Sequence, residues 1–133
     1  MLDSSVALAW FFADEGEATL VVLEQVGEAG AVVPPLWRYE VANGFLMAER
    51  RGRIDAEYRA RSLARLATLA ITSDEESDRR CWDATVALAE AHRLTVYDAA
   101  YLELAQRRGL PLATLDAALA RTARGAGVEV VSL

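Results

Sequence analysis

Hydrophobic and polar positions alternate along the chain between two kinds of pattern. Short apolar runs, typical of buried strands, end at Leu2 and cover residues 31–33, 69–71, 112–114 and 128–131. Between these runs, apolar residues recur every three or four positions, which predicts helices. We expect the helices at residues 6–12, 17–28, 36–51, 55 to about 68, 73 or 74 to about 92, 98–108 and from 116 onward, with an extended link at 94–97 and a polar break at 14–16. Strands that alternate with helices predict an α/β fold with a parallel sheet of about five strands, covered on both faces.

Length and composition are those of one folded domain. The chain has 133 residues, of which 53% are hydrophobic and 26% charged. A chain of this size buries about two-thirds of its unfolded surface, which is enough for a core. No apolar run approaches the roughly 20 residues of a membrane helix, and the N-terminus lacks a signal-peptide pattern. We therefore expect a single domain over residues 1–133, no association with membranes and a cytoplasmic location.

Three scarce residue types exclude several classes of chemistry. The chain has one cysteine, Cys81, and one histidine, His92, so an internal disulfide, a cysteine-rich zinc site and a multi-histidine site are impossible. It has no lysine, which excludes a P-loop and Schiff-base catalysis. The formal net charge is -6, whereas general nucleic-acid binders are usually basic. If nucleic acid is the ligand, it must be held locally.

Four acidic residues stand at the ends of predicted elements rather than on polar helix faces. Asp3 ends the first strand, Asp116 follows the strand 112–114, Asp98 interrupts an apolar stretch, and Glu40 lies early in its helix. Taken singly, each has a simpler explanation: an aspartate caps a helix N-terminus, and Glu40 meets the helix dipole. Taken together, they are expected to converge, because the carboxyl ends of parallel strands meet at one edge of the sheet.

Converging carboxylates predict a site for a hard divalent cation. Carboxylates that lie close together repel one another unless some are protonated or a cation joins them. Mg²⁺ and Mn²⁺ prefer oxygen ligands, and Mg²⁺ combines few protein carboxylates with waters and phosphate oxygens. The chemistry that such a site favours is metal-assisted hydrolysis of a phosphodiester.

The motifs resemble those of the PIN-domain ribonucleases, and among these the VapC-type toxins of bacterial toxin–antitoxin pairs. The resemblance runs over the whole chain and rests on four blocks in order: LDSSVALAW from Leu2, the segment from Pro35 to Asn43 with EVAN at its end, TVYDAAYLELA from Thr95, and LATLD from Leu112. The third block is the most specific. The family implies a three-layer α/β/α sandwich whose parallel sheet has the strand order 3-2-1-4-5.

The resemblance also implies a function and a set of site residues. Asp3, Glu40 and Asp98 match the family's acids that bind Mg²⁺ or Mn²⁺, Asp116 matches its more variable fourth acid, and Thr114 matches a hydroxyl residue beside the metal. We place Ser5 beside the metal as well. Relatives cleave single-stranded regions of RNA, form homodimers and are inhibited by an antitoxin protein. From its nearness to the acids, Arg38 is our candidate for a contact with a substrate phosphate.

Several alternatives remain open at this stage. Only Met1 and Leu2 precede Asp3, so the central strand is either very short or begins before the sequence shown. A phosphatase of the haloacid dehalogenase type also begins with strand and aspartate. That class requires a second aspartate at position 5, where this chain has Ser5, and a lysine, which it lacks. A PIN-like scaffold without activity and a housekeeping nuclease remain as competing functions.

Overall fold

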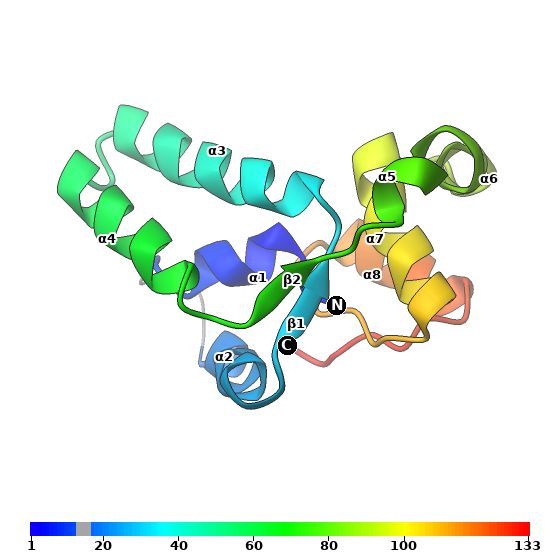
Figure 1. The fold of residues 1–133 in the computed structure, drawn as a ribbon, viewed down its shortest axis with the longest axis horizontal. Coiled ribbons are helices and arrows are strands. Elements are labelled where there is room, and N and C mark those ends of the chain that lie inside the picture. The colour runs from blue at the N-terminus through cyan, green and yellow to red at the C-terminus, as the bar shows by residue number, and fades with distance from the viewer. Residues whose placement is uncertain (13–16) are drawn as a thin grey trace.

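The computed structural model describes residues 1–12 and 17–133, and within them a short parallel sheet lies among helices (Figure 1). The polar break predicted at 14–16 lies outside the described residues. None of the described helices has the length and hydrophobicity needed to cross a membrane. The helices are α1 (Ser4–Ala9), α2 (Ala18–Ala29), α3 (Leu36–Arg50), α4 (Ala56–Leu66), α5 (Ser77–Arg80), the π-helical turn η1 (Cys81–Thr85), α6 (Val86–His92), α7 (Val96–Arg108) and α8 (Ala117–Gly125), and the strands are β1 (Ala31–Val33) and β2 (Ile71–Ser73).

The sheet is smaller than the sequence predicts. β1 and β2 pair in parallel, with Ala31 opposite Ile71. Two isolated parallel bridges, Leu2 with Ala113 and Leu112 with Val130, stand where three further strands were expected. In the predicted order 3-2-1-4-5, these pairings correspond to the neighbours 3-2, 1-4 and 4-5. Among the described residues no pairing joins Leu2 to β1, so the complete five-strand order remains a prediction.

Two helix starts differ from the prediction, and at each a side chain accepts a hydrogen bond from a backbone N–H of the first turn. The single helix expected from 73 or 74 to 92 is wrong: α5 begins only at Ser77, whose N–H donates to the Asp74 carboxylate at 2.8 Å, and the π-helical turn η1 interrupts the segment. The extended link expected over 94–97 is also wrong, since α7 begins at Val96. There Thr95 is the N-cap, and its hydroxyl accepts from the Asp98 N–H at 3.1 Å.

The first helix is fixed against α3 by aromatic side chains. α1 ends at Ala9, three residues earlier than predicted, and Phe11 and Phe12 turn onto Phe45 of α3 with ring centroids 5.4 and 5.8 Å apart. Nearby, Gly44 leaves room for Leu8, whose Cδ1 would lie 2.5 Å from a Cβ at that position. These contacts hold α1 in one orientation, and with it the residues at its N-terminus.

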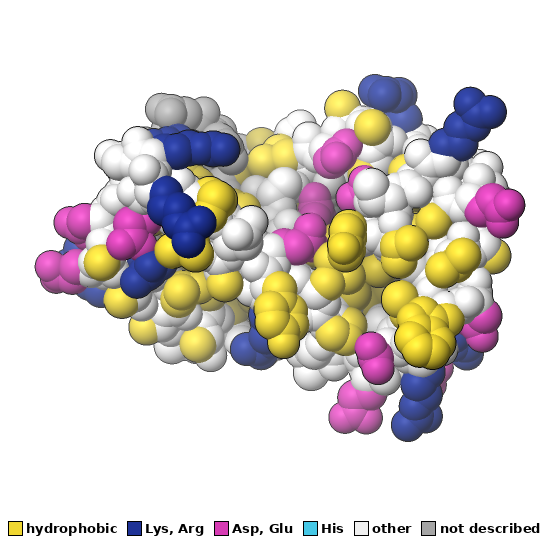
Figure 2. Space-filling view, turned by 90° about the horizontal axis from the view of Figure 1, so that it is seen from above, with side chains coloured by type: hydrophobic (Ala, Val, Ile, Leu, Met, Phe, Trp, Pro, Cys, Tyr) yellow, Lys and Arg dark blue, Asp and Glu magenta, His cyan; other side chains and the backbone are white. Residues whose placement is uncertain are grey.

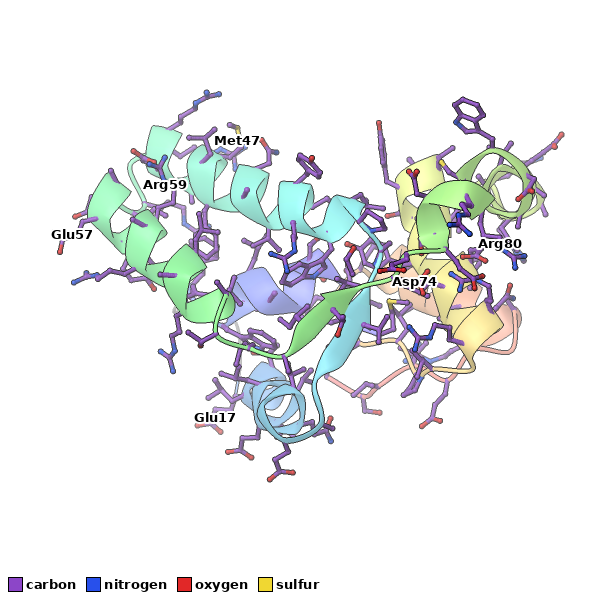
Figure 3. All side chains as sticks on the ribbon, viewed as in Figure 1. Glu17, Met47, Glu57, Arg59, Asp74 and Arg80 are labelled. Carbon is purple, nitrogen blue, oxygen red and sulfur yellow. The ribbon has the colours of Figure 1, made fainter. Side chains whose placement is uncertain are left out.

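A buried ionic cluster joins the segment after β2 to α7. Asp74, labelled in Figure 3, accepts from the Arg107 guanidinium at 2.7 Å, and Arg107 also donates to Glu103 at 2.8 Å. Both acids are buried. Burial alone would raise the pKa of Asp74, but the hydrogen bonds from Arg107 and Ser77 outweigh it and hold the pKa at about 2. The cluster fixes the C-terminal half of α7. Asp98 lies in the first turn of the same helix.

Gly30 supplies a prediction about stability. It ends α2 with φ 73° and ψ -177°, a conformation that only glycine adopts without strain, and a Cβ there would lie 2.7 Å from the backbone oxygen of Ala70. We expect Gly30→Ala to lower the free energy of unfolding by about 2–4 kcal/mol, measured by urea denaturation. Gly27→Ala is the matched control: it lies within α2 with open space around it, so it should preserve or slightly raise stability. Equal effects of the two substitutions would contradict this account of Gly30.

Candidate functional site

Asp3 stands at the centre of the candidate site. Its backbone N–H donates to the carbonyl of Ala113 at 2.9 Å, which fixes it at the end of the bridge between Leu2 and Ala113. Asp3 occupies the N-cap position of α1, yet its carboxylate accepts no N–H from that helix. The side chain is only 6% exposed. Helix capping, the simpler explanation of this residue, therefore does not account for its carboxylate.

Two hydroxyl groups hold the Asp3 carboxylate. Ser5 Oγ and Thr114 Oγ1 each donate to Asp3 Oδ2 at 2.6 Å. The same hydroxyls accept N–H groups from the following loop: Ser5 Oγ from Leu115 at 3.0 Å, and Thr114 Oγ1 from Asp116 at 3.0 Å. Asp3 and the loop that carries Asp116 are thus joined into one rigid unit.

Glu40 belongs to α3 and accepts a hydrogen bond from a residue that the sequence analysis missed. Tyr101 of α7 donates its hydroxyl to Glu40 Oε1 at 2.5 Å, and the tyrosine itself is buried. A buried tyrosine needs a hydrogen-bond partner, and Tyr101 lies one helical turn after Asp98; these were the signals available in the sequence. Glu40 is the fifth residue of α3, so the first-turn explanation of this acid does not apply.

Asp98 and Asp116 both lie near helix N-termini but in different ways. Asp116 is the N-cap of α8, and its Oδ1 accepts the N–H groups of Ala118 at 2.8 Å and Leu119 at 3.0 Å. Capping is therefore a real role of Asp116. Asp98 instead lies within the first turn of α7, since Thr95 is the cap there, and its carboxylate remains half-buried.

The pKa values of two of these acids respond to the charges of their neighbours. Burial raises the pKa of Glu40, and the charges of Asp3 and Asp98 raise it further against the hydrogen bond from Tyr101, which lowers it. Burial also raises the pKa of Asp98, followed by the charges of Asp116 and Asp3. Burial, and then the hydrogen bond to Glu40, raise the pKa of the Tyr101 hydroxyl. A bound cation would lower the free-energy cost of keeping such carboxylates ionised.

Arg38 is the predicted site residue that the structure does not bring to the acids. It lines a hollow between α3, α4 and β2, together with Trp37 and Val41. Glu40 is only two positions further along α3, and residues two apart on a helix point to different sides. The arrangement therefore gives no support to a contact between Arg38 and a phosphate at the acids.

The donor set fits a hard cation, although the acids do not enclose one as they stand. In the part of the chain that the structure describes, no three acidic, histidine or cysteine side chains come close enough together to hold a metal ion. The groups around Asp3 are nonetheless all oxygen donors: the carboxylates of Asp3, Glu40, Asp98 and Asp116 and the hydroxyl of Thr114. Mg²⁺ keeps several waters and needs only one or two carboxylates, so such a set fits it. The assignment of these residues as ligands remains a prediction.

Comparisons with known proteins agree on the fold. Residues 1–125 match the model of the PIN domain family. A crystal structure of PAE2754 from Pyrobaculum aerophilum is similar with a TM-score of 0.69 and 26% sequence identity, over 93% of this chain and 85% of that one. No curated protein matches the chain.

The raised pKa of Asp98 gives a prediction that does not depend on activity. An acid whose pKa is raised by folding destabilises the folded state at pH values above its unfolded pKa, near 3.8. In EDTA at pH 7, we expect Asp98→Asn to raise the free energy of unfolding by about 0.5–1 kcal/mol, the scale of a partly exposed charge interaction. Below pH 3.5 the gain should vanish, because the carboxyl is then neutral in the parent protein too.

The matched control is Asp78→Asn, which neutralises an exposed aspartate on α5. Urea denaturation at both pH values measures all three proteins. A lower stability of Asp98→Asn at pH 7, or a gain of the same size in Asp78→Asn, would contradict the repulsion among these acids.

Proposed function

This chain belongs to the PIN-domain family, and on that premise we propose that it is a Mg²⁺- or Mn²⁺-dependent endoribonuclease that hydrolyses phosphodiester bonds in single-stranded RNA. PIN domains are generally metal-dependent nucleases. The observation that carries the proposal is the set of interacting carboxylates around Asp3: burial, and then the charges of neighbouring acids, raise the pKa values of Glu40 and Asp98. A bound divalent ion would activate water and stabilise the leaving oxygen.

The residues of the chain orient the donors of this site. Ser5 and Thr114 donate to Asp3 Oδ2, whereas Asp3 Oδ1 accepts only a long hydrogen bond of 3.4 Å from Ser4 Oγ. Asp3 Oδ1 would therefore be the oxygen available to a metal ion. Tyr101 fixes one oxygen of Glu40 in the same way. Asp98 and Asp116 complete the set from the N-terminal turns of α7 and α8. Outer partners that orient ligands in this way commonly change affinity or activity 10- to 100-fold when removed.

We further propose that the chain is the toxin of a toxin–antitoxin pair, acting as a cytoplasmic homodimer and inhibited by an antitoxin protein. The four sequence blocks shared with VapC-type toxins support this more specific assignment. A non-catalytic scaffold is less favoured, because all four acids are present. Growth arrest on expression, relieved by the product of the neighbouring gene, distinguishes a toxin from a housekeeping nuclease.

Cleavage of RNA by the purified protein tests the proposed activity. With Mg²⁺ or Mn²⁺ we expect internal cuts in single-stranded RNA, and we expect EDTA to abolish them. Asp3→Asn and Asp98→Asn should each lower the cleavage rate at least about 100-fold, because each removes a charge that holds the cation. Gel electrophoresis of end-labelled RNA measures both effects.

Asp55→Asn is the control for this assay. Asp55 caps α4 through the Tyr58 N–H at 2.7 Å, far from the acids in sequence, and asparagine caps a helix equally well. Its rate should equal that of the parent protein. Cleavage that persists in both Asp3→Asn and Asp98→Asn would refute the site.

A further inference from the structure

Two exposed tyrosines directly precede acids of the candidate site in the sequence. Tyr39 precedes Glu40 on α3, and Tyr97 precedes Asp98 on α7. Tyr39 is 80% exposed and Tyr97 66% exposed, although aromatic side chains usually bury much of their surface. Neither ring contributes to the core.

The hydrogen bond between Glu40 and Tyr101 shows how these two rings are placed. It joins α3 to α7, so the face of α7 that carries Tyr101 turns toward α3. Tyr97 is four residues before Tyr101, which puts it on that same face, one turn nearer the N-terminus. Tyr39 directly precedes Glu40 on α3, and its exposure places its ring on the solvent side of that helix. In Figure 2 some of the acidic side chains lie in the middle of the face seen from above, and hydrophobic side chains stand beside them.

The charge of the site makes stacking a suitable way to hold RNA here. The acids repel phosphates until a cation is bound, the chain carries a net charge of -6, and it has no lysine. Aromatic rings hold single-stranded nucleic acid by stacking on the bases, which needs no positive charge and accepts any base. Exposed rings beside the acids are therefore able to supply affinity that charge does not.

We propose that Tyr39 and Tyr97 each stack on a base of single-stranded RNA, on the two sides of the phosphate that lies at the acids. The inference rests on the proposed function and deepens it, because it assigns the preference for single strands to two residues. Bases in a duplex are stacked on one another and are not open to the rings. The two tyrosines are thus residues that position the substrate.

Equilibrium binding tests the stacking separately from cleavage. Fluorescence anisotropy with a labelled single-stranded RNA is measured in the Asp98→Asn background, where the RNA stays intact. We expect Tyr39→Ala and Tyr97→Ala each to weaken binding about tenfold, within the range of one lost base stack. Tyr39→Phe and Tyr97→Phe keep the ring and should bind like the background protein. An abasic RNA of the same length should bind the alanine and tyrosine proteins equally.

Trp82→Ala is the matched control for loss of an exposed ring. Trp82 is 93% exposed on η1 and adjoins none of the four acids in sequence, so this variant should bind RNA unchanged. Alanine variants that bind RNA as tightly as the background protein would overturn the proposal. A change of Tyr39→Ala or Tyr97→Ala from dimer to monomer, measured by light scattering without RNA, would also overturn it. That result would mean that the rings contact a second copy of the chain. If the protein is a nuclease whose tyrosines do not stack on RNA, the parent protein will cleave RNA and the alanine variants will bind RNA as tightly as the Asp98→Asn background. If the proposed function is wrong, the parent protein will not cleave RNA.

Discussion

The repulsion among carboxylates around Asp3 is the constraint on which the arrangement of the site depends. Burial raises the pKa values of Glu40 and Asp98, and the charges of neighbouring acids raise them further, so keeping these groups charged costs free energy. The protein offsets part of this cost with neutral donors, since Ser5 and Thr114 donate to Asp3 and Tyr101 donates to Glu40. No basic side chain donates a hydrogen bond to Asp3 or Glu40 among the described contacts. A site whose charge is left largely unneutralised is suited to a divalent cation.

Contacts outside the site fix the elements that carry these donors. The aromatic contacts of Phe11 and Phe12 with Phe45 fix α1 against α3, which sets Asp3 relative to Glu40. At the far end of α7, the buried pairs of Arg107 with Asp74 and Glu103 fix that helix to the segment after β2. Here positive and negative charges are paired, in contrast to the site. One helix thus carries a neutralised ionic cluster at one end and an unneutralised acid at the other.

Periodicity was sufficient to predict most of the elements, because apolar spacing reflects burial directly. It was not sufficient where a side-chain hydrogen bond accompanies a boundary. Thr95 caps α7, which begins two residues before Asp98, and the Asp74 carboxylate accepts the N–H of Ser77, the first residue of α5. The π-helical turn η1 left no mark in the pattern. Three expected strands reduce to single bridges, since an apolar run alone does not specify how many hydrogen bonds a strand forms.

Three of the four candidate acids, Asp3, Asp98 and Asp116, stand at helix N-termini, where the sequence pattern pointed to them, whereas Glu40 lies on the second turn of α3. The hydrogen-bond partners of these acids were harder to predict. Thr114 followed from the family motif, whereas Tyr101 looked like an ordinary core aromatic until its hydroxyl was seen on Glu40. Arg38 was proposed from its nearness in sequence to Glu40, and the direction of a helical side chain decides against that argument. Contacts between residues distant in sequence, such as positions 40 and 101, are set by packing and cannot be read from spacing.

The central claim is that Asp3 is the main ligand of a divalent cation, and binding of Mn²⁺ tests it most directly. Electron paramagnetic resonance of free Mn²⁺ during titration measures the affinity without RNA or turnover. The account predicts saturable binding to the parent protein and to Asp55→Asn, and at least about tenfold weaker binding to Asp3→Asn. Equal affinity of Asp3→Asn and the parent protein would contradict it.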